Sequence, residues 1–278
     1  MFTVLTVEDR RKGGAVGKLF DVLALNSVKQ STERIASKEI RYIRLVQRSR
    51  KINWRKICRL AGNTKDRIVY TPKNSVPPDA GFVPFEPYEL RQRLCSNMAI
   101  EVLSIMQDVP DNLRIGIYDP AGDFADLPPY LLKYTDNLCV VTKNSRIYST
   151  LSKALINETG AVLRINRSVS ALANCGLIVS PVAIKERFTP LPSAVVLTSR
   201  KPEVYLPCFV YYKYSCRLPK ELQRFCPDGV DSEVFGGALY SFCGAYGLGS
   251  VVPFVCMNSE NSHTALSLRK YLQEQFGT

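Results

Sequence analysis

Three aspartates follow a short apolar stretch near the middle of the chain. Ile115 and Ile117 mark an apolar strand, and Asp119, Asp123 and Asp126 follow them, with Gly122 as the one glycine of the turn. Carboxylates in such a place can ligate a hard cation such as Mg²⁺, or they can accept hydrogen bonds from turn amides and cap the next helix. The spacing matches no established metal loop. We therefore expect a turn and a cap here, and no metal site.

Small polar and basic residues follow the next apolar stretch, 138–142. Thr142 ends this stretch, Lys143 and Arg146 follow it, and no acidic residue lies among them. Cations and hydroxyls at the end of a strand can hold a phosphate group. An ordinary solvated loop has the same composition, and both interpretations stay open.

The sequence has few residues that could form a nucleophilic catalytic site or a zinc site. His263 is the one histidine, and it directly precedes an expected helix over 264–276, which is typical of a capping segment. The nine cysteines are scattered and none forms a CxxC pair, which argues against a structural zinc site. Most of them lie among apolar neighbours, where reduced, buried thiols are common, so we expect a reducing compartment.

Targeting and membrane signals are weak. The longest apolar runs fall far short of the ~20 residues that a membrane helix needs. The first 14 residues are apolar first and basic afterwards, the reverse of a secretory signal. We therefore expect a soluble, cytoplasmic protein without a membrane partner.

Positive charge is concentrated near the N-terminus. Residues 1–60 hold 15 of the 37 Lys and Arg residues but only 5 of the 25 Asp and Glu residues. Aromatic residues interleave the densest part, 41–59, as in some surfaces that bind nucleic acid. No known nucleic-acid module is recognisable, and a solvated face or a face that docks an acidic partner or a second subunit fits equally well. The candidate residues are Arg41, Arg44, Arg48, Arg50, Lys51, Arg55 and Arg59.

Alternating strands and helices must position the central residues. From residue 113 the chain alternates apolar strands (113–119, 138–142, 161–165, 176–181 and 194–198) with helical stretches (124–134, 147–160 and 168–175). Strands that are apolar on both faces and separated by single helices indicate a parallel sheet with right-handed crossovers. The fold class that we predict is α/β: a Rossmann-like parallel sheet flanked by helices, with a smaller basic α+β N-terminal region and a helical C-terminal segment.

The flanking regions divide by composition. We expect strands at 2–8, 40–48 and 67–71, a loop or mobile helix at 26–39, and a helix that begins at Asn53 and ends at Gly62. Helices are also expected at 87–107, at 232–246 with Ser232 as its cap, and at 264–276. The segments that we predict are 1–71, a basic α+β region; 72–110, a proline-rich connector and long helix; 111–200, the α/β domain; and 201–278, a strand or loop and two helices that pack on the sheet.

The order of elements over residues 113–180 resembles the Rossmann-like NAD(P)-binding superfamily. The resemblance implies a pyrophosphate site at the first strand–helix turn, which here is Asp119–Phe124 with Gly122, and a 2′-phosphate site at Thr142, Lys143 and Arg146. The turn lacks the superfamily's closely spaced glycines, and Pro120 removes one amide donor. Asp119 and Asp123 would oppose a doubly charged phosphate at a cost of ~1–3 kcal/mol.

Three functional hypotheses follow from these features. The first is a non-catalytic protein with a degenerate nucleotide fold that binds a small-molecule ligand or a protein partner. The second is an NADP-dependent oxidoreductase, with 111–200 as its cofactor side. The third is a nucleic-acid-associated protein that uses the basic patch. The acidic turn and the single histidine favour the first hypothesis over the second. The cofactor, any catalytic residue and the oligomeric state are not specified by the sequence.

Overall fold

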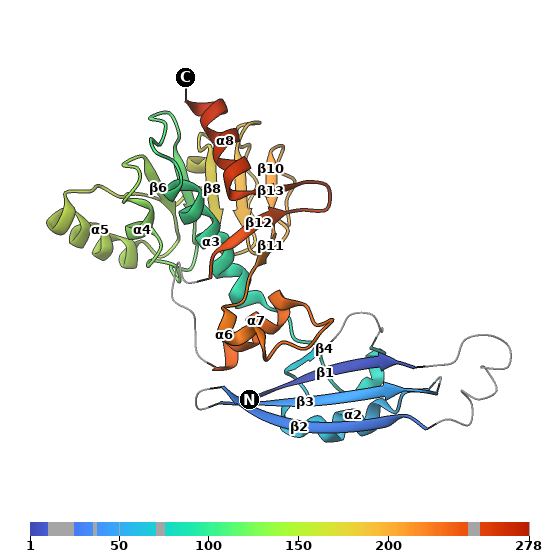
Figure 1. Cartoon of the computed structure of the whole chain (residues 1–278). Coiled ribbons are helices and arrows are strands. Elements are labelled where there is room, and N and C mark those ends of the chain that lie inside the picture. Colours follow the sequence, from blue (N-terminus) through green and yellow to red (C-terminus); the bar gives the residue numbers. More distant parts are fainter. Residues whose placement is uncertain (11–24, 36–37, 50, 71–75, 244–250, 278) are drawn as a thin grey trace. The chain divides into compact units, whose positions relative to one another are not determined.

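The computed structural model describes residues 1–10, 25–35, 38–49, 51–70, 76–243 and 251–277 (Figure 1). The chain forms two compact units, and each unit takes in two separate stretches of sequence. The first unit is Met1–Pro87 with Leu218–Ala245, and the second unit is Tyr88–Arg217 with Tyr246–Thr278. The segments expected from the sequence followed chain order, whereas each unit is completed by residues that return from later in the chain.

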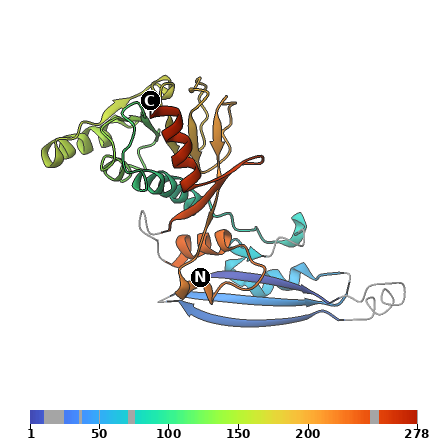
Figure 2. The same ribbon diagram turned by 45° about the horizontal axis from the view of Figure 1, so that its top comes forward.

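A four-stranded sheet forms the centre of the first unit. Its order is β2-β3-β1-β4, with β1 parallel to both neighbours and β2 antiparallel to β3. Helix α2 packs on β3, and its Ile57 and Ala61 join Leu5, Ile43 and Leu45 in one apolar cluster. The blue strands and the helix beside them are seen from a second angle in Figure 2. The elements are β1 (Phe2–Asp9), β2 (Ser27–Ile35), β3 (Lys38–Gln47), α2 (Trp54–Ala61), η1 (Gly62–Thr64), β4 (Ile68–Tyr70) and η2 (Pro78–Ala80).

The returning stretch of the first unit adds α6 (Lys220–Gln223) and α7 (Ser232–Cys243). Phe235 of α7 packs edge-on against Phe2 of β1, with ring centroids 5.9 Å apart. The expected cap of this helix was wrong by one residue. The Asp231 carboxylate, not Ser232, accepts hydrogen bonds from the Glu233 and Val234 amides, because a capping side chain must reach two or three residues ahead.

A six-stranded parallel sheet forms the centre of the second unit. Its order is β10-β9-β8-β5-β6-β7, and every neighbouring pair is parallel. Counted from β5, this is the strand order 3-2-1-4-5-6 of the doubly wound nucleotide-binding folds, which reverses between β5 and β8. The predicted α/β, Rossmann-like class is therefore confirmed. The strands are β5 (Ile115–Tyr118), β6 (Leu138–Val141), β7 (Arg164–Asn166), β8 (Leu177–Ser180), β9 (Val195–Thr198) and β10 (Phe209–Tyr211).

Long helices cover one face of this sheet and irregular segments cover much of the other. Helix α3 (Tyr88–Ser104) packs on β8 and β9, and the C-terminal helix α8 (Ala265–Phe276) packs on α3. The remaining helices are α4 (Pro128–Leu131), α5 (Ser145–Thr159) and the 3₁₀ turn η3 (Val169–Leu172). Loops, not helices, connect β8 to β9 and β9 to β10, and their Ile184 and Leu206 lie in the core with Tyr118 of β5.

A small antiparallel sheet completes the second unit. It consists of β11 (Lys213–Cys216), β12 (Pro253–Met257) and β13 (Ser262–Thr264). In the turn after β12, the Asn258 side-chain amide donates a hydrogen bond of 2.9 Å to the carbonyl of Val210, on the edge strand β10. The edge of the large sheet is therefore partly covered by the chain itself.

The largest error of the sequence prediction concerns residues 26–39. A loop or mobile helix was expected, but β2 and the start of β3 lie there, because pairing along β3 satisfies the backbone of a polar segment that has no apolar alternation. The expected helix 124–134 is shorter, with α4 spanning only Pro128–Leu131. The expected end of the helix at 232–246 and the glycines at 244, 247 and 249 lie outside the described residues.

Close packing of η3 on β5 predicts a large effect of a small substitution. A Cβ atom at Gly116 would lie 2.5 Å from the Leu172 side chain and 2.9 Å from the Cys175 sulfur. Gly116→Ala should therefore lower the free energy of unfolding by about 1–3 kcal/mol through overpacking. Chemical unfolding followed by circular dichroism measures this. Gly160→Asn is the control: nothing lies within 4 Å, the φ of +73° suits asparagine, and the expected change is within about 0.5 kcal/mol. Equal effects of the two variants would contradict the packing argument.

Candidate functional site

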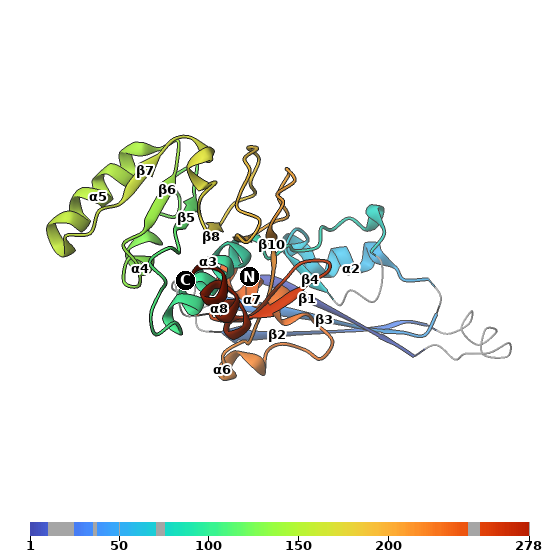
Figure 3. The same cartoon turned by 90° about the horizontal axis from the view of Figure 1, so that it is seen from above.

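The strand order places a candidate site at the carboxyl ends of β5 and β8. Ligands of doubly wound sheets bind in the crevice where the strand order reverses. Three loops meet at this edge of the second unit: 119–124 after β5, 142–146 after β6 and 181–188 after β8. Figure 3 views these strands from above, with α5 beside β7.

The Asp119 carboxylate occupies the turn after β5. The side chain is completely buried. One oxygen accepts hydrogen bonds from the amides of Gly122 (3.0 Å) and Asp123 (3.1 Å). The other accepts from the amide of Phe124 (2.9 Å) and from the Tyr148 hydroxyl (2.7 Å). These turn amides are the donors that a dinucleotide pyrophosphate would need, and here a carboxylate of the chain binds them.

Gly122 provides the left-handed backbone conformation that the turn after β5 requires. Its φ is +85°, a conformation that glycine adopts without strain. A Cβ there would lie 3.2 Å from both the Asn144 Cβ and the Ile147 side chain, so the loop after β6 fills the space beside it. Asn144 also donates a side-chain hydrogen bond of 3.1 Å to the Ala121 carbonyl. The two loops are therefore joined to each other at the place where a ligand would approach the glycine.

Tyr148 of α5 is the residue of this site that the sequence prediction missed. Its side chain is fully buried. Burial and then the hydrogen bond to Asp119 raise the pKa of the Tyr148 phenol well above its ordinary value. The phenol therefore stays protonated and donates to the carboxylate throughout the physiological range. A lone tyrosine on an amphipathic helix carries no sequence signal for such a role.

A second carboxylate links the loop after β8 to the loop after β6. Glu186, in the loop after β8, forms an ion pair of 2.9 Å with Lys143. It also accepts a hydrogen bond of 3.4 Å from the Tyr118 hydroxyl at the end of β5. Burial and the nearby Glu186 carboxylate raise the pKa of Tyr118 to about 12. Lys143, one of the cations proposed for a 2′-phosphate, thus already has an anionic partner.

The other predicted cofactor residues are divided between interior and surface. Thr142 is buried, and its hydroxyl accepts a hydrogen bond from the Asn144 amide (3.1 Å). Asp123 and Arg146 are exposed. Asp126 pairs with Arg93 of α3 at 2.5 Å, whereas Asp119 accepts from the turn amides and Tyr148, so these two aspartates have different partners. Within the described ranges, no group of three His, Cys, Asp or Glu side chains could hold a metal ion.

His263 and the cysteines form no catalytic arrangement within the described part of the chain. The His263 Nδ1 atom lies 3.3 Å from the Ser267 hydroxyl, and Thr264 caps α8 by accepting from the Ser267 amide. No described carboxylate contacts this pair. Cys139 and Cys175 are both buried, with their sulfur atoms 3.6 Å apart, and the eight cysteines whose side chains are described are all free.

The cations of the basic patch do not share one surface, because β3 places Arg41 and Arg44 on opposite faces of its sheet. The Arg41 guanidinium donates to the carbonyls of Leu60 (3.0 Å) and Ala61 (2.6 Å) and so covers the end of α2. Arg44 lies three residues further along the strand, on the opposite face, and pairs with Glu8 at 2.7 Å. Arg50 lies outside the described residues. The exposed cations that remain are Arg48, Lys51, Arg55, Lys56 and Arg59.

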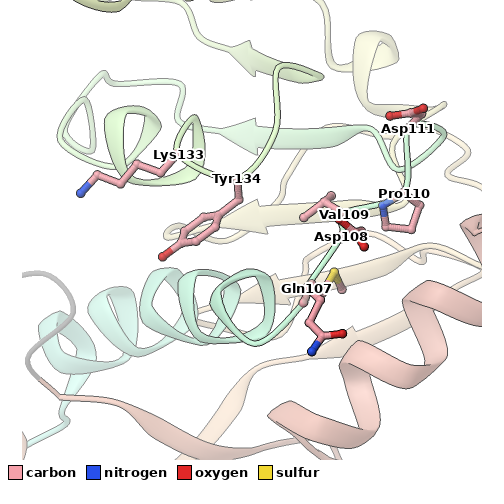
Figure 4. Close-up of a pocket in the computed structure, with 8 residues that line it drawn as sticks. Gln107, Asp108, Val109, Pro110, Asp111, Lys133 and Tyr134 are labelled. Carbon is pink, nitrogen blue, oxygen red and sulfur yellow. The ribbon is translucent and has the colours of Figure 1, made fainter.

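Three hollows of the second unit lie beside other residues than those predicted to bind a cofactor, although one of them is lined in part by Arg187 and Phe188 of the loop after β8. One of about 530 Å³ is drawn in Figure 4 and lies between residues 106–111, ahead of β5, and Lys133 and Tyr134. This hollow lies at the amino ends of the strands, whereas the predicted site lies at their carboxyl ends. Two others, of about 540 and 460 Å³, flank the exposed Tyr205. None includes a residue predicted to bind a cofactor.

Comparisons with known proteins add little to this geometry. No family model matches the chain, and no curated protein matches it. The solved structure of L-tryptophan dehydrogenase from Nostoc punctiforme is similar at a TM-score of 0.30 and 10% identity, over 99% of this chain and 80% of that one. At such a TM-score the likeness does not bear on function. Among the described helices, none is long and apolar enough to cross a membrane.

The buried carboxylate leads to a stability prediction. Asp119→Ala leaves the amides of Asp123 and Phe124 and the Tyr148 hydroxyl without their acceptor, whereas the Gly122 amide keeps its hydrogen bond of 3.3 Å to the carbonyl of residue 119. The variant should therefore lower the free energy of unfolding by about 2–4 kcal/mol. Tyr148→Phe removes one of the four donors and should cost about 1 kcal/mol. Asp123→Ala is the matched control at an exposed carboxylate, with an expected change within about 0.5 kcal/mol. Chemical unfolding measures all three, and a neutral Asp119→Ala would refute the structural role.

Proposed function

We propose that this protein is a non-catalytic binding protein whose Rossmann-like unit is a scaffold without a bound dinucleotide. One observation carries the proposal: the Asp119 carboxylate accepts hydrogen bonds from the amides of residues 122–124. An anion that entered this turn would have to displace the carboxylate, and it would still lie beside its charge. Two unit charges 4 Å apart repel by about 4 kcal/mol at an effective dielectric constant of 20.

The ion pair between Lys143 and Glu186 supports the same proposal. A 2′-phosphate at Lys143 would compete with Glu186 for the ammonium group, 2.9 Å from the carboxylate. The oxidoreductase alternative would therefore need rearrangement at both phosphate positions. On this proposal the protein acts through surfaces that dock a partner or a small ligand.

Thermal unfolding with dinucleotides tests the proposal. A ligand at 100 times its dissociation constant stabilises the folded protein by about 2.7 kcal/mol. We expect no shift of the melting temperature with 1 mM NAD, NADH, NADP or NADPH. A reproducible rise of a few degrees would overturn the proposal. Loss of an NADP-induced rise in Lys143→Ala and Arg146→Ala would then support the oxidoreductase.

The exposed face of α2 favours a second candidate function, association with nucleic acid. Arg55 and Arg59 are four residues apart and share one face of the helix, while Ile57 and Ala61 are buried on the other. Neither Arg55 nor Arg59 forms an ion pair with another described residue. Cations held on a regular element without internal partners are suited to phosphate contacts.

Binding of labelled DNA and RNA oligonucleotides, measured by fluorescence anisotropy, tests this candidate. We expect affinity that falls steeply with salt and that drops at least about tenfold in Arg55→Glu with Arg59→Glu. The matched control is Lys153→Glu with Lys220→Glu, two exposed lysines on α5 and α6. This pair changes the net charge equally and should have a much smaller effect. Absent binding, or equal loss in both double variants, would exclude α2 as a nucleic-acid surface.

A further inference from the structure

Strand β2 forms a long open edge of the first unit's sheet. It spans nine residues, and its pairing with β3 runs without a bulge from Ser27 to Ile35. Figure 1 shows it as the outermost strand, and no other described strand pairs with it. Within the described chain, its outer row of backbone amides and carbonyls is therefore free of sheet partners.

The other sheet edges are short or covered. Strand β4 has three residues, and the amide of Phe85 donates to its Ile68 carbonyl. At β10 the Asn258 side chain occupies the Val210 carbonyl, and β7 is only three residues long. Natural proteins protect long edges with charged side chains, proline, bulges or covering segments because an open edge pairs with other strands. Strand β2 carries charges of both signs, Lys29, Glu33 and Arg34. Such charges oppose pairing with most strands but favour a strand whose charges are complementary. Strand β2 contains no proline and shows no bulge, so it is the exception among these edges.

Side-chain charge specifies one arrangement of two such edges. Successive side chains of a strand alternate between the two faces of the sheet, and directly opposed residues of two paired strands lie on the same face. In a symmetric antiparallel pair of β2 strands, each residue lies on the same face in both copies. The two copies can therefore pair only in registers that place odd residues opposite odd residues. The register centred on Ser31 pairs all nine residues of each strand. It places Lys29 opposite Glu33 of the second copy, and Glu33 opposite the Lys29 of that copy.

The same register places a carboxylate beside two like charges of the sheet, Lys29 and Arg44. Lys29 lies directly opposite Arg44 of β3, and like charges in that position are unfavourable. Neither Lys29 nor Glu33 forms an ion pair with a described residue. A second copy would put a carboxylate on the open side of Lys29, on the face that already carries the Arg44–Glu8 pair.

We propose that β2 is a self-association surface: two copies of this chain pair their β2 strands antiparallel about Ser31, which joins two four-stranded sheets into one of eight strands. Such a contact is isologous, so each of its charge pairs occurs twice. Its central residues, Gln30, Ser31 and Thr32, are polar and exposed. Main-chain hydrogen bonds and charge therefore supply the association, which should weaken as salt increases.

A charge exchange tests the surface. In the full chain, Lys29→Glu and Glu33→Lys each replace two attractive pairs by two repulsive ones, so each should raise the dimer dissociation constant by about tenfold or more. The double variant exchanges the charges and should return the constant to within about threefold of the wild type. Analytical ultracentrifugation measures the constants, and circular dichroism checks that the variants fold. A monomeric wild type at all concentrations tested, or single variants that associate as the wild type does, would overturn the proposal.

Cross-linking tests the register independently. Directly opposed residues of an antiparallel pair have Cα atoms about 4.5–5.5 Å apart, within the range of a disulfide. Ser31→Cys should therefore form an intermolecular disulfide at position 31 under mild oxidation, detected by mass spectrometry of the linked peptides. Ser27→Cys lies on the same exposed strand and the same face, but the two copies would hold it far apart, so it should not cross-link. Cross-linking at 27 that equals that at 31 would refute the register.

Discussion

The hydrogen bonds between a buried carboxylate and three consecutive amides hold the turn after β5 at the carboxyl edge of the parallel sheet. A turn after a parallel strand leaves its amides pointing into a low-dielectric region, where an unsatisfied donor is costly. Asp119 satisfies those of residues 122–124 from inside the turn, and Tyr148 of α5 donates to the same carboxylate. The loop after β6 then packs on Gly122, so strand, turn and α5 are held together without a ligand.

The parallel sheet was predictable because its strands are apolar on both faces and are separated by turns and helices at regular intervals. Strand β2 was not, since it is polar on both faces and is specified only by its pairing with β3. The charge conflict between Asp119 and a phosphate follows from the residue types and stays a prediction. The occupation of the amides by that same carboxylate was not, because it depends on side-chain direction. The Glu186 bridge was missed because Lys143 and Glu186 are brought together only by the reversal of strand order.

The basic patch shows how sequence clustering can mislead. Arg41 and Arg44 stand three residues apart on a strand, and the two-residue period of a strand places them on opposite faces. One covers carbonyls at the end of α2, and the other pairs with Glu8. Aromatic neighbours are also engaged, since the Tyr42 hydroxyl donates to the Phe225 carbonyl and Trp54 packs on Phe82. The other exposed cations of the patch that the structure describes, Arg48, Lys51, Arg55 and Arg59, follow β3 in the chain.

A turn whose amides donate to the chain's own carboxylate needs no metabolite to satisfy those donors. In a protein whose turn binds a metabolite, the folded population rises and falls with the cellular pool of that metabolite, and so does resistance to proteolysis. The donors of residues 122–124 already have an internal acceptor at every metabolite concentration. If the proposed function holds, the stability that this turn contributes does not depend on the concentration of a metabolite.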